Sequence, residues 1–149
     1  MLEKAIHIAV EAHAGQLDRA GRPYILHPLR VMLFGRTEAE MICGVLHDVV
    51  EDTPISIDML RREGFSEEIL TAVDAISKRK GEKYADFIER VAKCELAASV
   101  KLNDLHDNMN RERIEEYEKA DEARHQKYIE AEKRLHQVCE AQGWTYRKF

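Results

Sequence analysis

Apolar residues recur every three or four positions along much of this 149-residue chain. Near the N-terminus they fall at Leu2, Ile6 and Val10, and a second clear run covers residues 67–77. This spacing places them along one face of an α-helix, whereas a half-buried strand needs strict alternation over several residues. Such alternation is not sustained anywhere in the sequence. The pattern therefore predicts an all-α fold.

Helix-starting and helix-ending residues divide this pattern into segments. We expect helices over residues 2–13, 29–34, 38–50, 56–60, 67–77, 84–93 and 96–109. Ser56 and Ser66 are of the residue type that caps helix N-termini, and Pro28 suits the first turn of a helix. Residues 16–26 form a loop, and residues 78–83 form a second loop that is basic and contains a glycine.

The C-terminal part of the chain differs in composition from the rest. Residues 111–142 are highly charged with sparse apolar positions, which predicts one long exposed helix or a helix pair. Its charged surface is either a solvated face or a contact in a homo-oligomer. Gly143 should end this segment, and the aromatic tail 144–146 should pack back. We therefore expect residues 1–149 to form a single domain with a C-terminal helical extension over 111–149.

Composition narrows the class of protein. Apolar residues make up 44% of the chain and charged residues 34%, as in a soluble globular domain. The net charge of −5 implies no basic surface, so we expect no nucleic-acid partner. No apolar run approaches the roughly 18 residues that would span a membrane. The three scattered cysteines form neither a disulfide framework nor a zinc pattern, which favours the cytoplasm.

The densest group of reactive side chains lies in residues 43–54, where an apolar run ends in four metal- or proton-handling groups. These are His47, Asp48, Glu51 and Asp52. On a helix, side chains four positions apart stack along one ridge, so the four groups would form a compact cluster. The Thr-Pro pair that follows stops the helix. A solvated helix end is the alternative interpretation of these acids.

A second polar group interrupts the last strongly apolar helix. Asp104 and Asn108 lie four positions apart there, and burying a carboxylate without a partner is costly. A metal would provide that partner. With His27 and the His47-Asp48 pair, Asp104 offers two imidazoles and two carboxylates, a set that suits Mn²⁺, Fe²⁺, Zn²⁺ or Mg²⁺. Mixed nitrogen and oxygen ligands are typical of catalytic rather than structural metal sites.

Four motifs follow one another in order within residues 1–110. They read His13-Ala14-Gly15-Gln16; Gly21-Arg22-Pro23-Tyr24-Ile25-Leu26-His27-Pro28; Leu46-His47-Asp48-Val49-Val50-Glu51-Asp52-Thr53; and Val100-Lys101-Leu102-Asn103-Asp104 with Asn108-Met109. Together they resemble the HD-domain hydrolases of the alarmone (p)ppGpp, which include the hydrolase half of Rel/Spo proteins and the small alarmone hydrolases. A lone His-Asp pair would be a weak signal, whereas several motifs in register are specific.

The resemblance implies an all-α HD fold with one Mn²⁺ held by four side chains. These are His27, His47, Asp48 and Asp104. It also implies that Glu51 and Asp52 act on the hydrolytic water and its neighbours, and that Asn108 hydrogen-bonds ribose or phosphate. The implied reaction removes pyrophosphate from the ribose 3′ position. In such a site a metal lowers the pKa of a water and polarises a phosphoryl oxygen.

The chain departs from the family's pattern at two places. Where the family carries an Arg-Lys pair after the glutamine, this chain has Asp18-Arg19, and Asp18 cannot stack on a guanine base. After Asp104 the family often reads Arg-Leu-His, whereas this chain reads Leu105-His106-Asp107. We therefore expect the chemistry to survive with an altered or relaxed nucleobase preference, for example for a (p)ppApp-like substrate.

Three residues are candidates for binding the substrate: Arg19, Lys78 and Asn108. An anionic nucleotide that approaches an acidic metal site needs local positive charge, although Lys78 and its basic neighbours could equally form a solvated turn. The leading hypothesis is removal of the 3′-pyrophosphate from (p)ppGpp or a related nucleotide. One alternative is a metal-dependent phosphatase acting on a 3′- or 5′-monophosphate or a nicotinamide dinucleotide phosphate. The other is a metal- or nucleotide-binding module without turnover.

Overall fold

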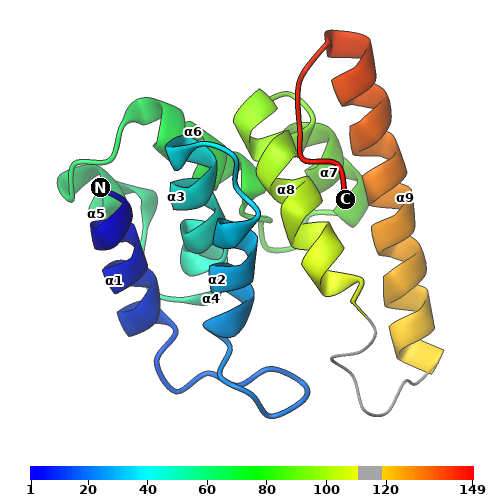
Figure 1. Cartoon of the computed structure of the whole chain (residues 1–149). Helices are drawn as coiled ribbons and strands as arrows, with labels where there is room; N and C mark the ends of the chain where they lie inside the picture. The colour runs from blue at the N-terminus through cyan, green and yellow to red at the C-terminus, as the bar shows by residue number, and fades with distance from the viewer. Residues whose placement is uncertain (111–118) are drawn as a thin grey trace.

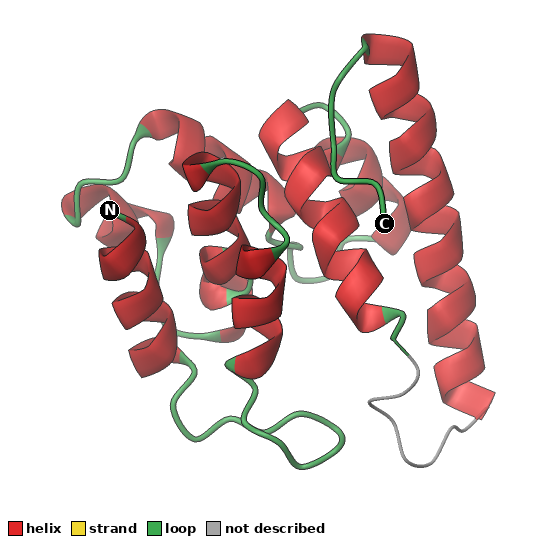
Figure 2. Cartoon of the chain, viewed as in Figure 1, coloured by secondary structure: helices red, strands yellow, loops and turns green. Residues whose placement is uncertain are grey.

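The computed structural model describes residues 1–110 and 119–149, and their side chains except for residues 119–121. This part of the chain consists of helices and loops, with no strand among the described residues (Figure 2). In chain order the helices are α1 (Leu2–Ala12), α2 (Leu26–Leu33), α3 (Glu38–Leu46), α4 (Val49–Asp52), α5 (Ile57–Arg62), α6 (Glu67–Ile76), α7 (Tyr84–Val91), α8 (Glu95–Asn108) and α9 (Lys119–Gln142). The all-α class expected from the apolar pattern is confirmed.

Two helices organise the bundle. Helix α3 packs against α1, α2, α6 and α8, while α8 packs against α2, α3, α6, α7 and α9. Figure 1 shows α1 to α4 on one side and α7 to α9 on the other, with α8 facing α2 and α3. Ten of the fourteen residues of α8 are buried. The polar residues that the sequence places on this helix are therefore taken into the core, where they need partners.

Local sequence signals account for several helix starts. Thr37, Ser56 and Ser66 each accept a hydrogen bond from the backbone N–H three residues later, as N-caps do. The expected caps at Ser56 and Ser66 are thus present. Helix α2 begins at Leu26 rather than at residue 29, so its first turn contains the His27-Pro28 pair. Proline is tolerated there because the first N–H groups of a helix have no intrahelical acceptor.

The expectation of one continuous helix over residues 38–50 is wrong. Helix α3 ends at Leu46 and α4 begins at Val49. The reason is local: Nδ1 of His47 donates to the Gly44 carbonyl at 2.6 Å, which is the acceptor that a continuous helix would offer to the N–H of Asp48. The His47-Asp48 pair therefore lies at a junction between two helices instead of along a single ridge.

Gly44 also sets how closely α2 and α3 approach each other. A Cβ atom at this position would lie 3.0 Å from the Cα of Met32, which is closer than side-chain and backbone carbons normally come. Glycine therefore allows the two helices to pack backbone against backbone. This close packing brings the helix that carries His27 next to the helix that ends at His47.

The C-terminal segment is partly as expected. The long charged helix is present as α9, while residues 111–118 of the expected segment lie outside the described residues. Gly143 follows it in a left-handed conformation with φ +69°, as is common after a helix C-terminus. The tail packs back, because Arg36 donates from Nη2 to the Thr145 carbonyl at 2.9 Å. Among the described helices, none combines the length and the apolarity needed to cross a bilayer.

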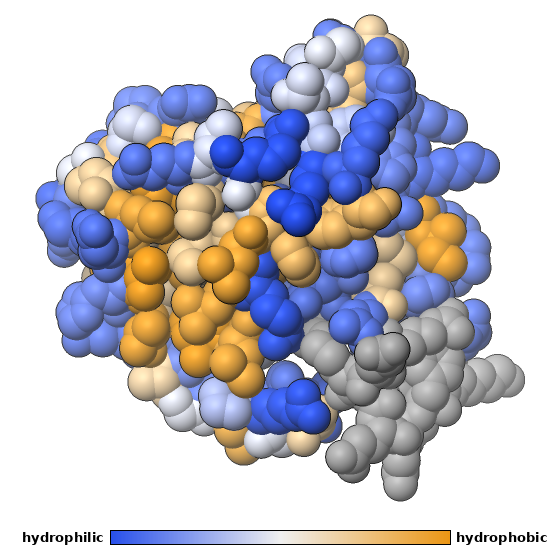
Figure 3. Space-filling view, in the orientation of Figure 1, coloured by the Kyte–Doolittle hydropathy of each residue, from blue (hydrophilic) through white to orange (hydrophobic). Residues whose placement is uncertain are grey.

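One face of the molecule is rich in apolar side chains. Figure 3 shows them gathered over α1 and α2. The exposed members include Val10 on α1 and both Leu26 and Leu33 on α2, and Leu33 retains 66% of its accessible surface. Scattered apolar residues on a surface are ordinary, whereas a gathered patch is a candidate contact surface.

Candidate metal and nucleotide site

Four side chains from three separate stretches of the sequence meet at one point between α2, α8 and the α3–α4 junction. Nε2 of His27 lies 2.9 Å from Oδ1 of Asp104, and Nε2 of His47 lies 3.2 Å from the same atom. Oδ2 of Asp48 lies 3.0 Å from Nε2 of His47 and 3.7 Å from that of His27. The structure thus brings together all four side chains predicted as metal ligands.

The two imidazoles point the same nitrogen into this cluster. Nδ1 of His47 donates to the carbonyl of Gly44, which can only accept, so Nε2 carries the lone pair in the neutral ring. His27 is buried, and its Nδ1 lies 2.6 Å from the carboxylate of Asp107. In both rings an acceptor at Nδ1 fixes the orientation and leaves Nε2 facing the cluster, as is usual for metal-binding histidines.

Asp104 is the most connected member of the cluster. Its Oδ2 accepts from the ammonium of Lys101 at 2.7 Å, and its Oδ1 accepts from the amide of Asn108 at 3.0 Å. Burial raises the pKa of the Asp104 carboxyl, but the charges of Lys101 and His47 outweigh burial and hold that pKa well below its usual range. Asp104 is therefore an ionised carboxylate in the core, with oxygens directed at both imidazoles.

Opposing effects also set the charge of the two histidines. Burial lowers the pKa of His27, but hydrogen bonds to Asp104 and Asp107 exceed this effect and raise it. Burial likewise lowers the pKa of His47, and the carboxylates of Asp48 and Asp104 raise it well above the usual value. The carboxylates of the cluster therefore stabilise positive charge placed between them.

The donor set fits a divalent metal. His27, His47 and Asp104 each offer a ligand atom, and these three atoms lie within 4.8 Å of one another among buried residues. Asp48 adds a further carboxylate oxygen beside both imidazoles. Two nitrogens and two carboxylates suit first-row divalent ions, and four side chains leave coordination positions for water.

The two predicted catalytic acids lie beside this cluster rather than in it. Asp48, Glu51 and Asp52 form a second group whose carboxylate oxygens lie within 4.8 Å of one another. Oε1 of Glu51 accepts from the backbone N–H of Lys78 at 2.7 Å. Burial is the main cause that raises the pKa of Glu51. Burial, with the negative charges of Asp48 and Glu51, raises the pKa of Asp52 to about 6.

This shift of Asp52 makes the stability of the metal-free protein depend on pH. The folded-state pKa lies above the ordinary value, so Asp52 favours folding when protonated, and that contribution is lost as the pH rises through about 6. We expect Asp52→Asn to raise the melting temperature in the presence of EDTA at pH 8. The gain should shrink below pH 6 and vanish near pH 4, the ordinary range of a carboxyl pKa.

The control for this measurement is Glu130→Gln, which removes one negative charge from an exposed position on α9. It should leave the pH dependence of the melting temperature as in the wild type. An equal rise in melting temperature for Asp52→Asn at pH 4 and pH 8 would contradict the assignment, because the benefit would then come from packing rather than from removing a charge.

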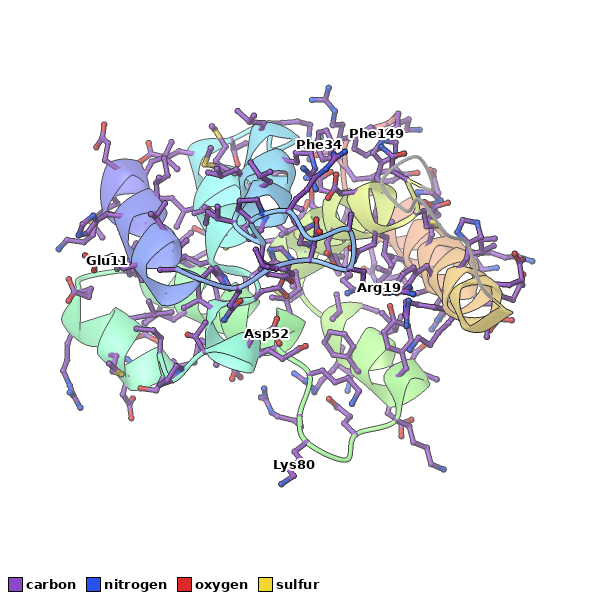
Figure 4. All side chains as sticks on the ribbon, turned by 90° about the horizontal axis from the view of Figure 1, so that it is seen from below. Glu11, Arg19, Phe34, Asp52, Lys80 and Phe149 are labelled. Carbon is purple, nitrogen blue, oxygen red and sulfur yellow. The ribbon has the colours of Figure 1, made fainter. Side chains whose placement is uncertain are left out.

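A pocket of about 310 Å³ opens beside His27. Its walls come from the loop after α1, from α2, from α8 and from α9. They are Leu17, Asp18, Arg19, Ala20, Tyr24, His27, Asn108, Arg124 and Tyr128. In Figure 4 the side chain of Arg19 lies near α8 and α9, and Lys80 points away into solvent at the tip of its loop. The pocket thus places two cationic side chains, Arg19 and Arg124, on the same surface as His27 of the four-residue cluster.

The three predicted substrate-binding residues are placed differently. Arg19 and Asn108 line this pocket, and Asn108 also contacts the cluster through Asp104. Lys78 does not line it. Its backbone holds Glu51, and its ammonium donates to the Arg79 carbonyl at 3.4 Å. The structure therefore brings Lys78 to Glu51 and the other two to the pocket.

Asp18, the main departure from the family's pattern, organises its own loop. Its Oδ1 accepts from the backbone N–H groups of Ala20 and Arg22, both at 2.9 Å. This is the Asx-type hydrogen bonding that short acidic side chains make in turns. The residue therefore shapes the wall of the pocket that carries Arg19, while its side chain has no flat surface on which a base could stack.

The sequence alone missed several residues of the site. Tyr24 donates from its hydroxyl to Oδ2 of Asp48 at 2.5 Å, although it stands inside a motif that had been singled out. Asp107 contacts His27 from behind. Arg124 and Tyr128 come from the charged C-terminal helix, where a four-residue spacing is too common to indicate a binding face.

An all-α bundle in which a histidine, an adjacent His-Asp pair and a distant aspartate converge defines the HD-domain class of protein.

Comparison with known proteins indicates which proteins of this class the chain is similar to. No family model matches the sequence. Over 79 residues the chain is 42% identical to the guanosine-3′,5′-bis(diphosphate) 3′-pyrophosphohydrolase of Borreliella burgdorferi, covering 50% of this chain and 12% of that protein.

Two further relatives are similar over longer stretches of the chain. Over 120 residues the chain is 30% identical to the protein of the same description from Aquifex aeolicus, covering 72% of this chain and 17% of that one. Over 89 residues it is 36% identical to a GTP pyrophosphokinase of Streptomyces coelicolor, covering 57% of this chain and 10% of that one. The chain thus spans only a small part of the length of these curated relatives.

A solved structure shares the fold. It is described as a metazoan ortholog of SpoT that hydrolyses ppGpp, and it aligns with a TM-score of 0.71 over 97% of this chain and 96% of its own, at 22% identity. The chain is thus similar in sequence to bacterial proteins named guanosine-3′,5′-bis(diphosphate) 3′-pyrophosphohydrolases, and it shares the fold of the solved structure.

Proposed function

We propose that this protein is a metal-dependent phosphohydrolase that removes the 3′-pyrophosphate from (p)ppGpp or a related alarmone nucleotide. The observation that carries the proposal is the convergence of His27, His47, Asp48 and Asp104 beside a pocket lined by cationic and polar side chains. The names of the similar proteins support the substrate class. We infer Mn²⁺ as the metal, with other divalent ions as substitutes.

Bound by these four residues, the metal would lower the pKa of a water and polarise a phosphoryl oxygen. The chain's own residues would do the rest. Glu51 and Asp52 stand next to Asp48, where either can accept the proton of the attacking water. A carboxylate whose pKa has been raised towards neutrality is a better general base than an ordinary one, and in the metal-free protein burial raises the pKa of Asp52 to about 6.

The pocket would hold the nucleotide through contacts of several kinds. Arg19 and Arg124 would neutralise phosphate charge, and Tyr128 would hydrogen-bond to phosphate or ribose. The amide of Asn108 lies between the pocket and Asp104, a position from which it would orient the ribose next to the scissile bond. Such positioning accounts for a large part of phosphoryl-transfer catalysis.

The test is a nucleotide panel assayed in parallel with Mn²⁺, Mg²⁺ and Zn²⁺. We expect ppGpp or ppApp to release pyrophosphate with Mn²⁺, and EDTA to reduce the rate to background. A protein with bound Mn²⁺ that leaves both nucleotides intact would remove the substrate claim. Panel members without a 3′-pyrophosphate, such as 3′-monophosphates, serve as the matched controls.

A second candidate is a phosphatase acting on another nucleotide, and Asp18 favours it. At the loop position where the family carries a stacking arginine, this chain has Asp18, whose carboxylate accepts hydrogen bonds within the turn. The pocket therefore lacks that stacking surface, which would relax the preference for guanine. Release of inorganic phosphate, rather than pyrophosphate, from a monophosphate or a nicotinamide dinucleotide phosphate would support this candidate over the first.

The setting of the protein is part of the same proposal. The net charge of −5 argues against a nucleic-acid partner. The three cysteines are free, as expected for a protein of the reducing cytoplasm. We infer that residues 1–149 act as one domain, and that the apolar surface over α1 and α2 is the contact through which a homo-oligomer would form.

A further inference from the structure

Behind His27 lies an ion pair between Arg30 and the buried carboxylate of Asp107, and it contributes no ligand to the metal cluster. Asp107 sits one turn after Asp104 on α8 and is only 3% exposed. Its Oδ2 lies 2.6 Å from Nδ1 of His27, and its Oδ1 accepts from Nε of Arg30 at 2.7 Å. The two carboxylate oxygens are thus divided between the histidine and an arginine of α2.

This geometry decides which nitrogen of His27 can bind a metal. A neutral imidazole has one N–H donor and one lone pair. The Asp107 carboxylate accepts only, so it holds the proton on Nδ1 and leaves the lone pair on Nε2. That nitrogen lies 2.9 Å from Asp104 and 3.7 Å from Asp48. A carboxylate behind a ligating histidine fixes the tautomer and the ring plane and increases the basicity of the ligand.

Arg30 offsets the cost of burying the Asp107 carboxylate and fixes its orientation. An ionised carboxylate is costly to bury without a compensating charge, and the Arg30 guanidinium provides that charge at 2.7 Å. Arg30 and His27 are both on α2, three residues apart. The pair therefore connects Asp107 of α8 to two side chains of α2, and the imidazole lies between the carboxylates of Asp107 and Asp104.

We propose that Asp107, held by Arg30, is a positioning residue that sets the metal affinity of the cluster by fixing His27 with its proton on Nδ1. The inference rests on the metal site of the proposed function, but not on its substrate. It assigns to Asp107 a role different from that of the four ligands, because Asp107 acts on the metal only through the imidazole.

The decisive variant is Asp107→Asn, which keeps the size of the side chain. Nδ1 of His27 and Nε of Arg30 contact different oxygens of Asp107, and an amide keeps only one oxygen, so one of the two donors would face an NH₂ group. If the NH₂ group faces the imidazole, it stabilises the tautomer with its proton on Nε2, which cannot bind a metal through that atom. We expect Mn²⁺ and Zn²⁺ affinity, measured by calorimetry without nucleotide, to fall about 10- to 100-fold, the usual effect of losing such a partner.

A second variant and a matched control separate positioning from general damage. Arg30→Gln should weaken the affinity less, because Asp107 remains as the acceptor. The control is Glu40→Gln, since Glu40 is also a buried carboxylate paired with an arginine, Arg36, at 2.6 Å. It should lower the melting temperature and leave the affinity for both metals within about two-fold of wild type.

A spectroscopic measurement tests the tautomer itself. In wild-type protein saturated with diamagnetic Zn²⁺ and labelled with ¹⁵N-histidine, Nδ1 of His27 should carry a proton protected from exchange. In Asp107→Asn this protection should be lost. Wild-type affinity in Asp107→Asn, or an unchanged protected Nδ1 proton, would overturn the inference while leaving the proposed function intact. Conversely, tight metal binding by a wild-type protein that cleaves no nucleotide would remove only the proposed function.

Discussion

An Asp104→Ala variant is expected to lose divalent-metal binding and, in the presence of EDTA, about 3–5 kcal/mol of unfolding free energy, the usual cost of removing one partner of a buried ion pair. Asp104 accepts hydrogen bonds from Lys101 and Asn108 and lies within 3.2 Å of both imidazoles. Lys101 is itself buried, and its pKa is raised despite burial, chiefly by the charge of Asp104. Without that carboxylate, the folded protein must bury an uncompensated ammonium or a deprotonated lysine.

Urea denaturation with EDTA measures the stability term, and calorimetric titration with Mn²⁺ measures the metal term. The two losses are separated by the double variant Lys101→Met/Asp104→Ala. It should recover a large part of the stability, since replacing both members of a buried ion pair by apolar groups is often neutral, but it should not recover metal binding. If the single variant were as stable as wild type, Asp104 would not be the charge partner of Lys101.

Glu51→Gln is expected to retain the metal and lose turnover by a factor on the order of 10²–10⁴, the usual contribution of general acid–base catalysis. Glu51 contacts the acidic group around Asp48 but stands outside the set of His27, His47 and Asp104. Its carboxylate is held in place by the backbone N–H of Lys78. An amide of the same size can still accept that hydrogen bond, but it cannot take a proton from water.

Steady-state rates of pyrophosphate release measure this effect, with metal content determined on the same samples. Glu11→Gln, at an exposed position on α1 (Figure 4), is the control for the loss of one negative charge and should turn over as the wild type does. A similar loss in Asp52→Asn would show that the two acids act together. Undiminished turnover in both acid variants would exclude general-base catalysis by this helix, whereas absent turnover in the wild type would favour a binding module.

The helical class and most of the helices could be predicted from the sequence, because apolar period and capping residues act over a few positions. Ser56 and Ser66 cap the helices they were expected to cap. The break at His47 could not be predicted in the same way. It arises because the imidazole of His47 competes for the carbonyl of Gly44. Whether the ring takes that position depends on its tertiary contacts with Asp48 and Asp104.

The candidate metal ligands were also identified from the sequence, but only through residue types and motif order. Nothing in the pattern states that His27 and Asp104, 77 positions apart, lie within 2.9 Å. Asp107 is one of the positions at which the chain departs from the family's pattern. In the structure this carboxylate contacts His27 at 2.6 Å and Arg30 at 2.7 Å, so the altered position has a partner of its own.

By itself the sequence determined the helical class, the chemistry of the side chains and the short-range spacing of the His-Asp pair from its neighbouring acids. Only the tertiary structure decided which carboxylate stands behind which imidazole, and that Arg124 and Tyr128 of the C-terminal helix close the pocket beside His27. The physical reason is the distance along the chain over which each interaction acts. Helix propensity and capping are governed by neighbours within about one turn, whereas the site depends on how α2, α3, α8 and α9 pack around a shared core.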